Sequence, residues 1–164
     1  MDTNEITIGQ AFDSLNSGLN EWLTEGVIST ESIEIFNSAV QADLNFRDVL
    51  MGLPKHHELD KLSGFITYII PMVDGADKVP YLSILSSYAF ESTDNVEIAN
   101  QILSDALEID PEYPLGKLLK RVYGAGWPSS SFAEMRNQLD TKVRNTIQER
   151  WDTTIGEIKE WANA

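Results

Sequence analysis

The sequence contains no cysteine among its 164 residues. This absence excludes a disulfide scaffold, a catalytic thiol, an iron–sulfur cluster and a zinc site built on thiolates. Basic residues are also scarce, because 12 lysines and arginines stand against 26 acidic residues and the net charge is -14. A chain with this balance repels phosphate, so we expect no direct binding of nucleic acid.

Long hydrophobic runs are missing as well. The longest apolar stretch, residues 65–73, is too short to cross a bilayer and contains Pro71. The first residues are acidic and polar, whereas a secretory signal begins with basic residues followed by an apolar core. We therefore expect no membrane association and a cytoplasmic location.

What the chain does have is helical periodicity along most of its length, with apolar residues recurring at spacings of three and four. No stretch shows the sustained alternation that is typical of a strand. The pattern predicts an all-α fold, a compact single domain over residues 1–164 with about seven to eight helices. Helices are expected over residues 8–23, 33–40, 44–53, 59–69, 80–89, 98–106 and 114–122, with one long C-terminal helix over 129–164.

Capping residues support several of these boundaries. Gly26 can end the first helix, and either Ser29 or Thr30 can cap the second. Asp94 and Glu97 resemble a capping box that opens the helix over residues 98–106.

The C-terminal helix changes its apolar face along its length, since the apolar residues before and after residue 150 fall on stripes about a quarter turn apart. In one interpretation the helix bends near Thr154 or Gly156 and packs on its own domain. In the other it meets a second protein chain, either a different partner or a second copy in a homodimer. The candidate partner-binding residues in that case are Trp151, Ile155, Ile158 and Trp161.

Charge is unevenly distributed along the chain. Residues 1–46 contain eight acidic and no basic residues, and residues 74–112 contain nine acidic residues and one lysine, so each block has a net charge of -8. Residues 117–164 contain eight basic and six acidic residues. An acidic surface of this kind favours a protein partner with a basic surface. The candidate acidic surface consists of Glu91, Asp94, Glu97, Asp105, Glu108 and Glu112.

Two resemblances concern the middle of the chain. Residues 99–111 resemble the second helix of a tetratricopeptide repeat, with Ala99, Leu103, Ala106 and Pro111 at the positions of that pattern. The resemblance implies a helical hairpin that packs closely through its alanines.

A longer stretch, from about residue 47 to 128, resembles the C-terminal helical part of an actinobacterial family called domain of unknown function 4192. The resemblance implies a helical core over 47–128, flanked by acidic N-terminal helices over 1–46 and the long helix over 129–164, and it implies no particular reaction. The matching residues are Arg47, Asp48, Leu82, Leu85, Ala89, Ala99, Ala106, Leu107, Asp110, Pro111, Tyr113, Leu115, Leu118, Leu119, Gly126 and Pro128.

Residues for catalysis are few. The only cluster of metal-type ligands is His56, His57 and Glu58 with Asp60. Adjacent histidines point to different sides of a helix, so we expect neither a metal nor a cofactor. The leading hypothesis is a non-enzymatic acidic helical protein-interaction module. The alternative is an acidic DNA mimic or inhibitor, of the kind mobile elements of bacteria and phages use to block a DNA-binding or nuclease protein. A hydrolase with a metal at the two histidines is a third, weaker hypothesis.

Overall fold

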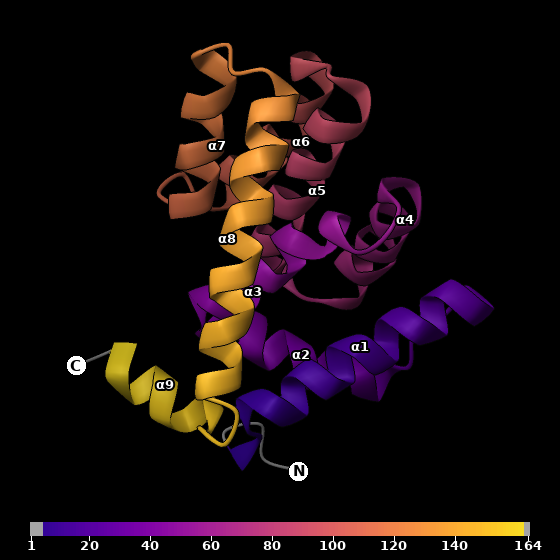
Figure 1. Cartoon of the computed structure of the whole chain (residues 1–164), viewed down its shortest axis with the longest axis vertical. Coiled ribbons are helices and arrows are strands. Elements are labelled where there is room, and N and C mark those ends of the chain that lie inside the picture. Colours follow the sequence, from indigo (N-terminus) through magenta and orange to yellow (C-terminus); the bar gives the residue numbers. More distant parts are fainter. Residues whose placement is uncertain (1–4, 163–164) are drawn as a thin grey trace. The chain divides into compact units, whose positions relative to one another are not determined.

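The computed structural model describes residues 5–162 of the chain, with side chains up to residue 158. The described residues form nine α-helices (Figure 1), which confirms the all-α prediction. These are α1 (Ile8–Glu25), α2 (Thr30–Ala42), α3 (Leu44–Gly52), α4 (Leu59–Ile69), α5 (Lys78–Thr93), α6 (Val96–Ile109), α7 (Pro114–Gly124), α8 (Ser129–Glu149) and α9 (Ile155–Ala162). Three short 3-10 helices are η2 (Leu53–Lys55), η3 (Ile70–Met72) and η4 (Gly75–Asp77).

The helices belong to two compact units, and the expectation of a single domain over residues 1–164 stays a prediction. Unit 1 combines the two ends of the chain, Met1–Leu50 and Asp140–Ala164, and unit 2 is the continuous segment Met51–Leu139. The boundaries fall inside α3 and α8. A helix crosses each boundary, so no irregular linker indicates the division, although Gly52 and Pro54 lie just after the first boundary.

Unit 1 begins with a helical pair, α1 and α2, which pack against each other. Thr7 and Gln10 form a capping box at the start of α1, and Gly26 ends the helix with a left-handed φ of 73°. A Cβ atom added to Gly18 would lie 3.2 Å from Ile28 and 3.3 Å from Phe36. A small residue at that position therefore lets the two helices approach closely.

The predicted C-terminal helix is interrupted, which corrects the expectation of one long helix over residues 129–164. Helix α8 ends at Glu149, and the amides of Ile8 and Gly9 donate hydrogen bonds of 2.8 Å to the carbonyls of Thr153 and Trp151. The amide of Ile155 donates in return to the carbonyl of Ile6, at 2.9 Å. These bonds to the N-terminal segment fix the chain in a turn, after which α9 begins.

Unit 2 is organised around α5, which packs against α4, α6 and α7. Its side chains are buried on nearly every side, as expected for a helix in the middle of a core. The buried serines of α5 bond to backbone carbonyls: the hydroxyl of Ser83 donates to Val79 at 2.9 Å, and that of Ser87 to Ile84 at 2.7 Å. Polar side chains are thereby accommodated in the core without loss of hydrogen bonds.

The connection between α5 and α6 differs in detail from its prediction. Asp94 ends α5 in a left-handed conformation, with φ of 51°, and the next residue, Asn95, caps α6. The side chain of Asn95 accepts a hydrogen bond of 2.9 Å from the amide of Glu97. The predicted capping residue was therefore wrong by one position, because Asp94 takes the turn conformation that asparagine and aspartate tolerate better than other residues.

Within residues 5–162, no helix has the length and apolar character needed to span a bilayer.

Candidate interaction surfaces

Two of the predicted partner-binding residues of the C-terminal segment, Ile155 and Ile158, are buried in unit 1. Ile155 is completely buried and Ile158 is 6% exposed. The Trp151 ring meets the ring of Phe12 edge-on, with centroids 5.7 Å apart, and it covers Gly9 so closely that an added Cβ would clash with it. Ile155 and Ile158 are therefore not available on the surface of unit 1, as expected if this segment packs on its own domain, whereas Trp151 is half-buried and stays a candidate.

The homodimer through the C-terminal helix stays a prediction. The side chain of Trp161, the fourth candidate, lies outside the described residues. Ile155 and Ile158 are buried because the turn after α8 directs the apolar side of α9 towards the rest of unit 1, including α2.

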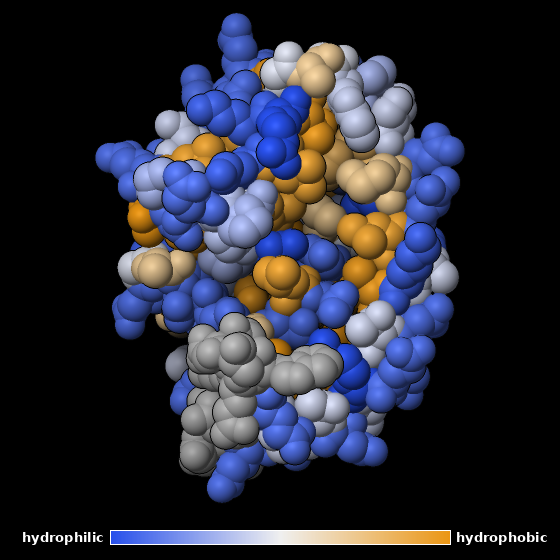
Figure 2. Space-filling model, turned by 90° about the vertical axis from the view of Figure 1, so that its left-hand side faces the viewer, coloured by the Kyte–Doolittle hydropathy of each residue, from blue (hydrophilic) through white to orange (hydrophobic). Residues whose placement is uncertain are grey.

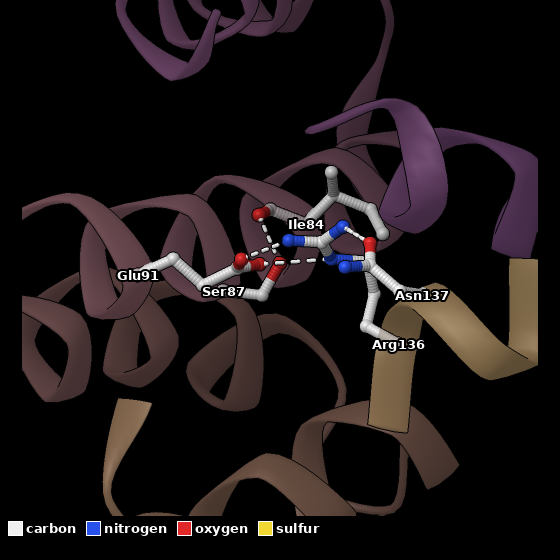
Figure 3. Close-up of polar contacts among 5 residues, drawn as sticks. All are labelled: Ile84, Ser87, Glu91, Arg136 and Asn137. Carbon is white, nitrogen blue, oxygen red and sulfur yellow. Dashed lines mark hydrogen bonds and ion pairs between the residues drawn. The ribbon is translucent and has the colours of Figure 1, made fainter. Parts of the chain in front are cut away.

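The acidic candidates divide into one buried and five exposed residues. Glu91, on α5, forms a buried ion pair with Arg136 of α8, in which the two side chains are 4% and 5% exposed (Figure 3). The Arg136 guanidinium bonds both carboxylate oxygens of Glu91 and also the side-chain oxygen of Asn137. Glu91 is thus not part of an acidic surface, which corrects its prediction.

In this buried cluster the Glu91 carboxylate is paired with the Arg136 guanidinium, and the polar atoms have hydrogen-bond partners. Burial raises the pKa of the Glu91 carboxyl above its ordinary value, and the Arg136 guanidinium acts in the opposite direction. Among the described residues, no buried side-chain nitrogen or oxygen lacks a hydrogen-bond partner. The cluster fixes the start of α8 to α5 and has no unsatisfied group directed at a ligand.

The other five acidic candidates are exposed as predicted, and three of them share one side of α6. Glu97, Asp105 and Glu108 are spaced so that they project from neighbouring positions around the helix. Two isoleucines on the same outward side, Ile98 and Ile109, are 40% and 44% exposed. The name "α6 outward face" is used below for Glu97, Ile98, Asp105, Glu108 and Ile109.

On its other side, α6 borders a groove against α7. One hollow of about 490 Å³ is lined by Asn100, Leu103, Ser104, Leu107, Glu108 and Lys120. A second, of about 600 Å³, is lined by Leu107, Pro111, Lys117, Lys120 and Arg121. They share Leu107 and Lys120 and together form the α6–α7 groove. Figure 2 shows hydrophobic surface between hydrophilic side chains in its upper half, where α7 faces the viewer.

The groove is basic along α7, although the protein as a whole is acidic. Lys117, Lys120 and Arg121 are exposed at spacings of three and four, so they project from one side of this helix. Lys117 forms an exposed ion pair of 3.0 Å with Glu112. Lys120 and Arg121 form no ion pair with any of the described residues. Sequence reasoning missed this groove, and the cluster of three bases in a five-residue stretch was its only signal.

The histidine pair lies in the connection after η2. Among the described residues, no three histidine or acidic side chains come together as a metal site would require. His56 is exposed and His57 is half-buried.

Comparison of the chain with family models, with curated proteins and with solved structures found no match. The resemblance of residues 47–128 to domain of unknown function 4192 therefore stays a prediction.

Proposed function

We propose that this protein is a non-enzymatic helical interaction module that binds a basic, amphipathic protein segment through the α6 outward face. The observation that carries the proposal is the combination of two exposed isoleucines with a row of exposed carboxylates on one helix. Carboxylates attract a basic partner and orient it, whereas apolar side chains supply binding energy when water is removed from them.

The arrangement of α5 and α6 supports this role. We propose that the two helices form a hairpin of the tetratricopeptide type, because Ala99, Leu103 and Ala106 are all buried towards the core of unit 2. The hydroxyl of Ser86 donates a hydrogen bond of 2.7 Å to the carbonyl of Ala99, so the helices approach closely at this point. A rigid base of this kind would hold the outward face of α6 in a fixed shape, which reduces the entropy lost on binding.

The experiment is a fluorescence anisotropy titration with a labelled helical peptide composed of lysine and leucine. We expect saturable binding that weakens about tenfold in Ile98→Ala/Ile109→Ala, because two apolar contacts are lost. We also expect weaker binding with a shallower salt dependence in Glu97→Gln/Asp105→Asn/Glu108→Gln. Glu31→Gln/Glu34→Gln, which neutralises two exposed acidic residues of unit 1, is the matched control and should bind as the wild type does. Unchanged binding in both α6 variants would contradict the proposal.

A second candidate function is the acidic DNA mimic, which blocks a DNA-binding or nuclease protein. The observation in its favour is the spacing of Glu97, Asp105, Glu108 and Glu112, all exposed along α6 and just after it. The same variants separate the two functions, because mimicry rests on charge alone. Binding that falls steeply with salt but is insensitive to Ile98→Ala/Ile109→Ala would favour the mimic.

The proposed site of action is the cytoplasm.

A further inference from the structure

We propose that the α6–α7 groove is a second binding site, which takes an acidic peptide segment carrying leucine-sized side chains beside its carboxylates. This site borders the α6 outward face, with which it shares Glu108, and it selects a partner of the opposite charge. Its occupant follows from the shape, the floor and the rim of the groove.

The floor of the groove is apolar and fixed by close helix packing. Leu103 is 1% exposed, and Leu107, which lines both hollows, is half-buried. A Cβ added to Gly116 would lie 2.8 Å from Leu107 Cδ2, so α7 meets α6 closely here and a larger residue would displace the Leu107 side chain. The floor can therefore cover one or two aliphatic side chains, and it is too small for a whole helix-bundle interface.

The α7 rim determines the charge of the occupant. Lys120 and Arg121 form no ion pair with any described residue, and Lys117 is held only by Glu112, whose side chain is 82% exposed. Such an exposed pair contributes little and can exchange its carboxylate for another. Three bases beside an apolar floor therefore complement a segment in which carboxylates flank an aliphatic residue.

The opposite rim excludes a longer polyanion. Glu108 lines the groove on the α6 side, and the remaining carboxylates of the α6 outward face lie beyond it. A nucleic acid, with phosphates along its whole length, would be repelled there. A short acidic peptide can turn its carboxylates towards α7 and leave its apolar side chains over Leu107.

The probe for the test is a short fluorescein-labelled peptide composed of leucine, aspartate and glutamate, titrated with the full chain at low salt. We expect saturable anisotropy, and we expect Lys120→Glu/Arg121→Glu to weaken binding at least about tenfold. Ser104→Trp, which places a bulky ring in the groove without changing charge, should weaken it as well. Lys142→Glu, a charge reversal in unit 1, is the matched control and should stay within about twofold of the wild type.

Two further experiments test whether the bound peptide must be both apolar and acidic. A peptide with alanine in place of leucine should bind at least about tenfold more weakly, because the apolar floor is left uncovered. Glu108→Gln should strengthen binding of the acidic peptide, whereas the same change weakens binding of a basic peptide to the α6 outward face. The proposal is overturned if the acidic peptide shows no saturable binding, if Lys120→Glu/Arg121→Glu binds it as the wild type does, or if a thymidine oligonucleotide binds more tightly than the peptide.

Discussion

Arg136 and Glu91 show how the environment of a single residue changes the meaning of its charge. Both belong to stretches that look like ordinary polar helix faces in the sequence, but in unit 2 they form a buried ion pair whose side chains are 5% and 4% exposed. Removal of one partner from a buried pair leaves an uncompensated charge, whereas the pair itself contributes little net stability.

This asymmetry gives a prediction for Arg136→Met. We expect the free energy of unfolding, measured by urea denaturation at neutral pH, to fall by about 3–5 kcal/mol. Lys117→Met is the control, since it also removes one cation from an ion pair, but from an exposed one, and should lower stability by less than about 1 kcal/mol. The double variant Glu91→Leu/Arg136→Met should recover most of the loss. Equal effects of the two single variants would be inconsistent with a buried pair.

At the scale of the residue, helix capping could be predicted from the sequence, but the burial of individual side chains could not. Gly26 and Ser29 perform the capping roles that their types and positions indicated. The burial of Glu91 was not predictable, because its partner Arg136 lies 45 residues further along the chain. Only the fold brings them together, so no local pattern could distinguish Glu91 from the exposed acidic residues of α6.

At the scale of the element, the apolar side chains of α9 pack within unit 1, as the first of the two interpretations of this segment predicts. Ile155 is completely buried, and the amide at its start bonds to the carbonyl of Ile6. We predict that Ile155→Ala lowers the free energy of unfolding by about 2–4 kcal/mol, because it removes buried methyl groups and leaves a cavity. Ile109→Ala, at a 44% exposed site, should change it by less than about 0.5 kcal/mol. Thermal or urea denaturation followed by circular dichroism measures both changes. An Ile155→Ala variant as stable as the wild type would contradict a structural role of α9.

The helices of unit 2 contain three buried tyrosines with raised pKa values. Burial raises the pKa of Tyr123 from its ordinary value near 10 to about 12, and burial raises those of Tyr81 and Tyr88 well above 10. Between pH 10 and about 12, the buried tyrosines of the folded state retain protons that the same tyrosines of the unfolded state have released. Stability must therefore fall as the pH rises from 10 towards 12, with about 1.4 kcal/mol per pH unit from each tyrosine.

The corresponding measurement is a series of urea denaturations across this alkaline range. Tyr123→Phe should reduce the slope of stability against pH by about one third, because one of three late-titrating groups is gone. Ser86→Ala serves as the control: it removes the 2.9 Å contact with the Tyr123 hydroxyl but keeps the phenol, so the slope should remain. An unchanged slope in Tyr123→Phe would show that its pKa is not raised.

Helix boundaries were predictable where the sequence has a proline or glycine that begins or ends a helix. Pro114 begins α7 and Gly26 follows α1, as their types indicated. The end of α8 at Glu149 was missed because residues 150–155 contain no proline or glycine. Their turn depends on backbone hydrogen bonds to residues 6–9, more than 140 positions away. Periodicity indicated this event as a change of apolar face, and the bend predicted near Thr154 or Gly156 lies close to the observed turn, but the pattern did not show that the helix ends there.

At the scale of the whole molecule, unit 2 is one continuous segment and unit 1 is assembled from the two ends of the chain. We predict that the fragment 51–139 folds alone, with a helical circular dichroism spectrum and a cooperative thermal transition, because its core residues all lie within it. The fragment 1–50 should not, since it lacks the turn and α9. An unfolded 51–139 fragment, or an independently folded 1–50 fragment, would contradict this division.

The bridge between Thr7 and Thr154 also has a consequence for biosynthesis. A ribosome releases the acidic amino-terminal helices long before it has translated the residues that complete their hydrophobic centre. During that interval residues 51–139 emerge and can fold first, while residues 1–50 remain without the residues 140–164 that complete unit 1. The high density of negative charge in this N-terminal segment would help to keep it from aggregating.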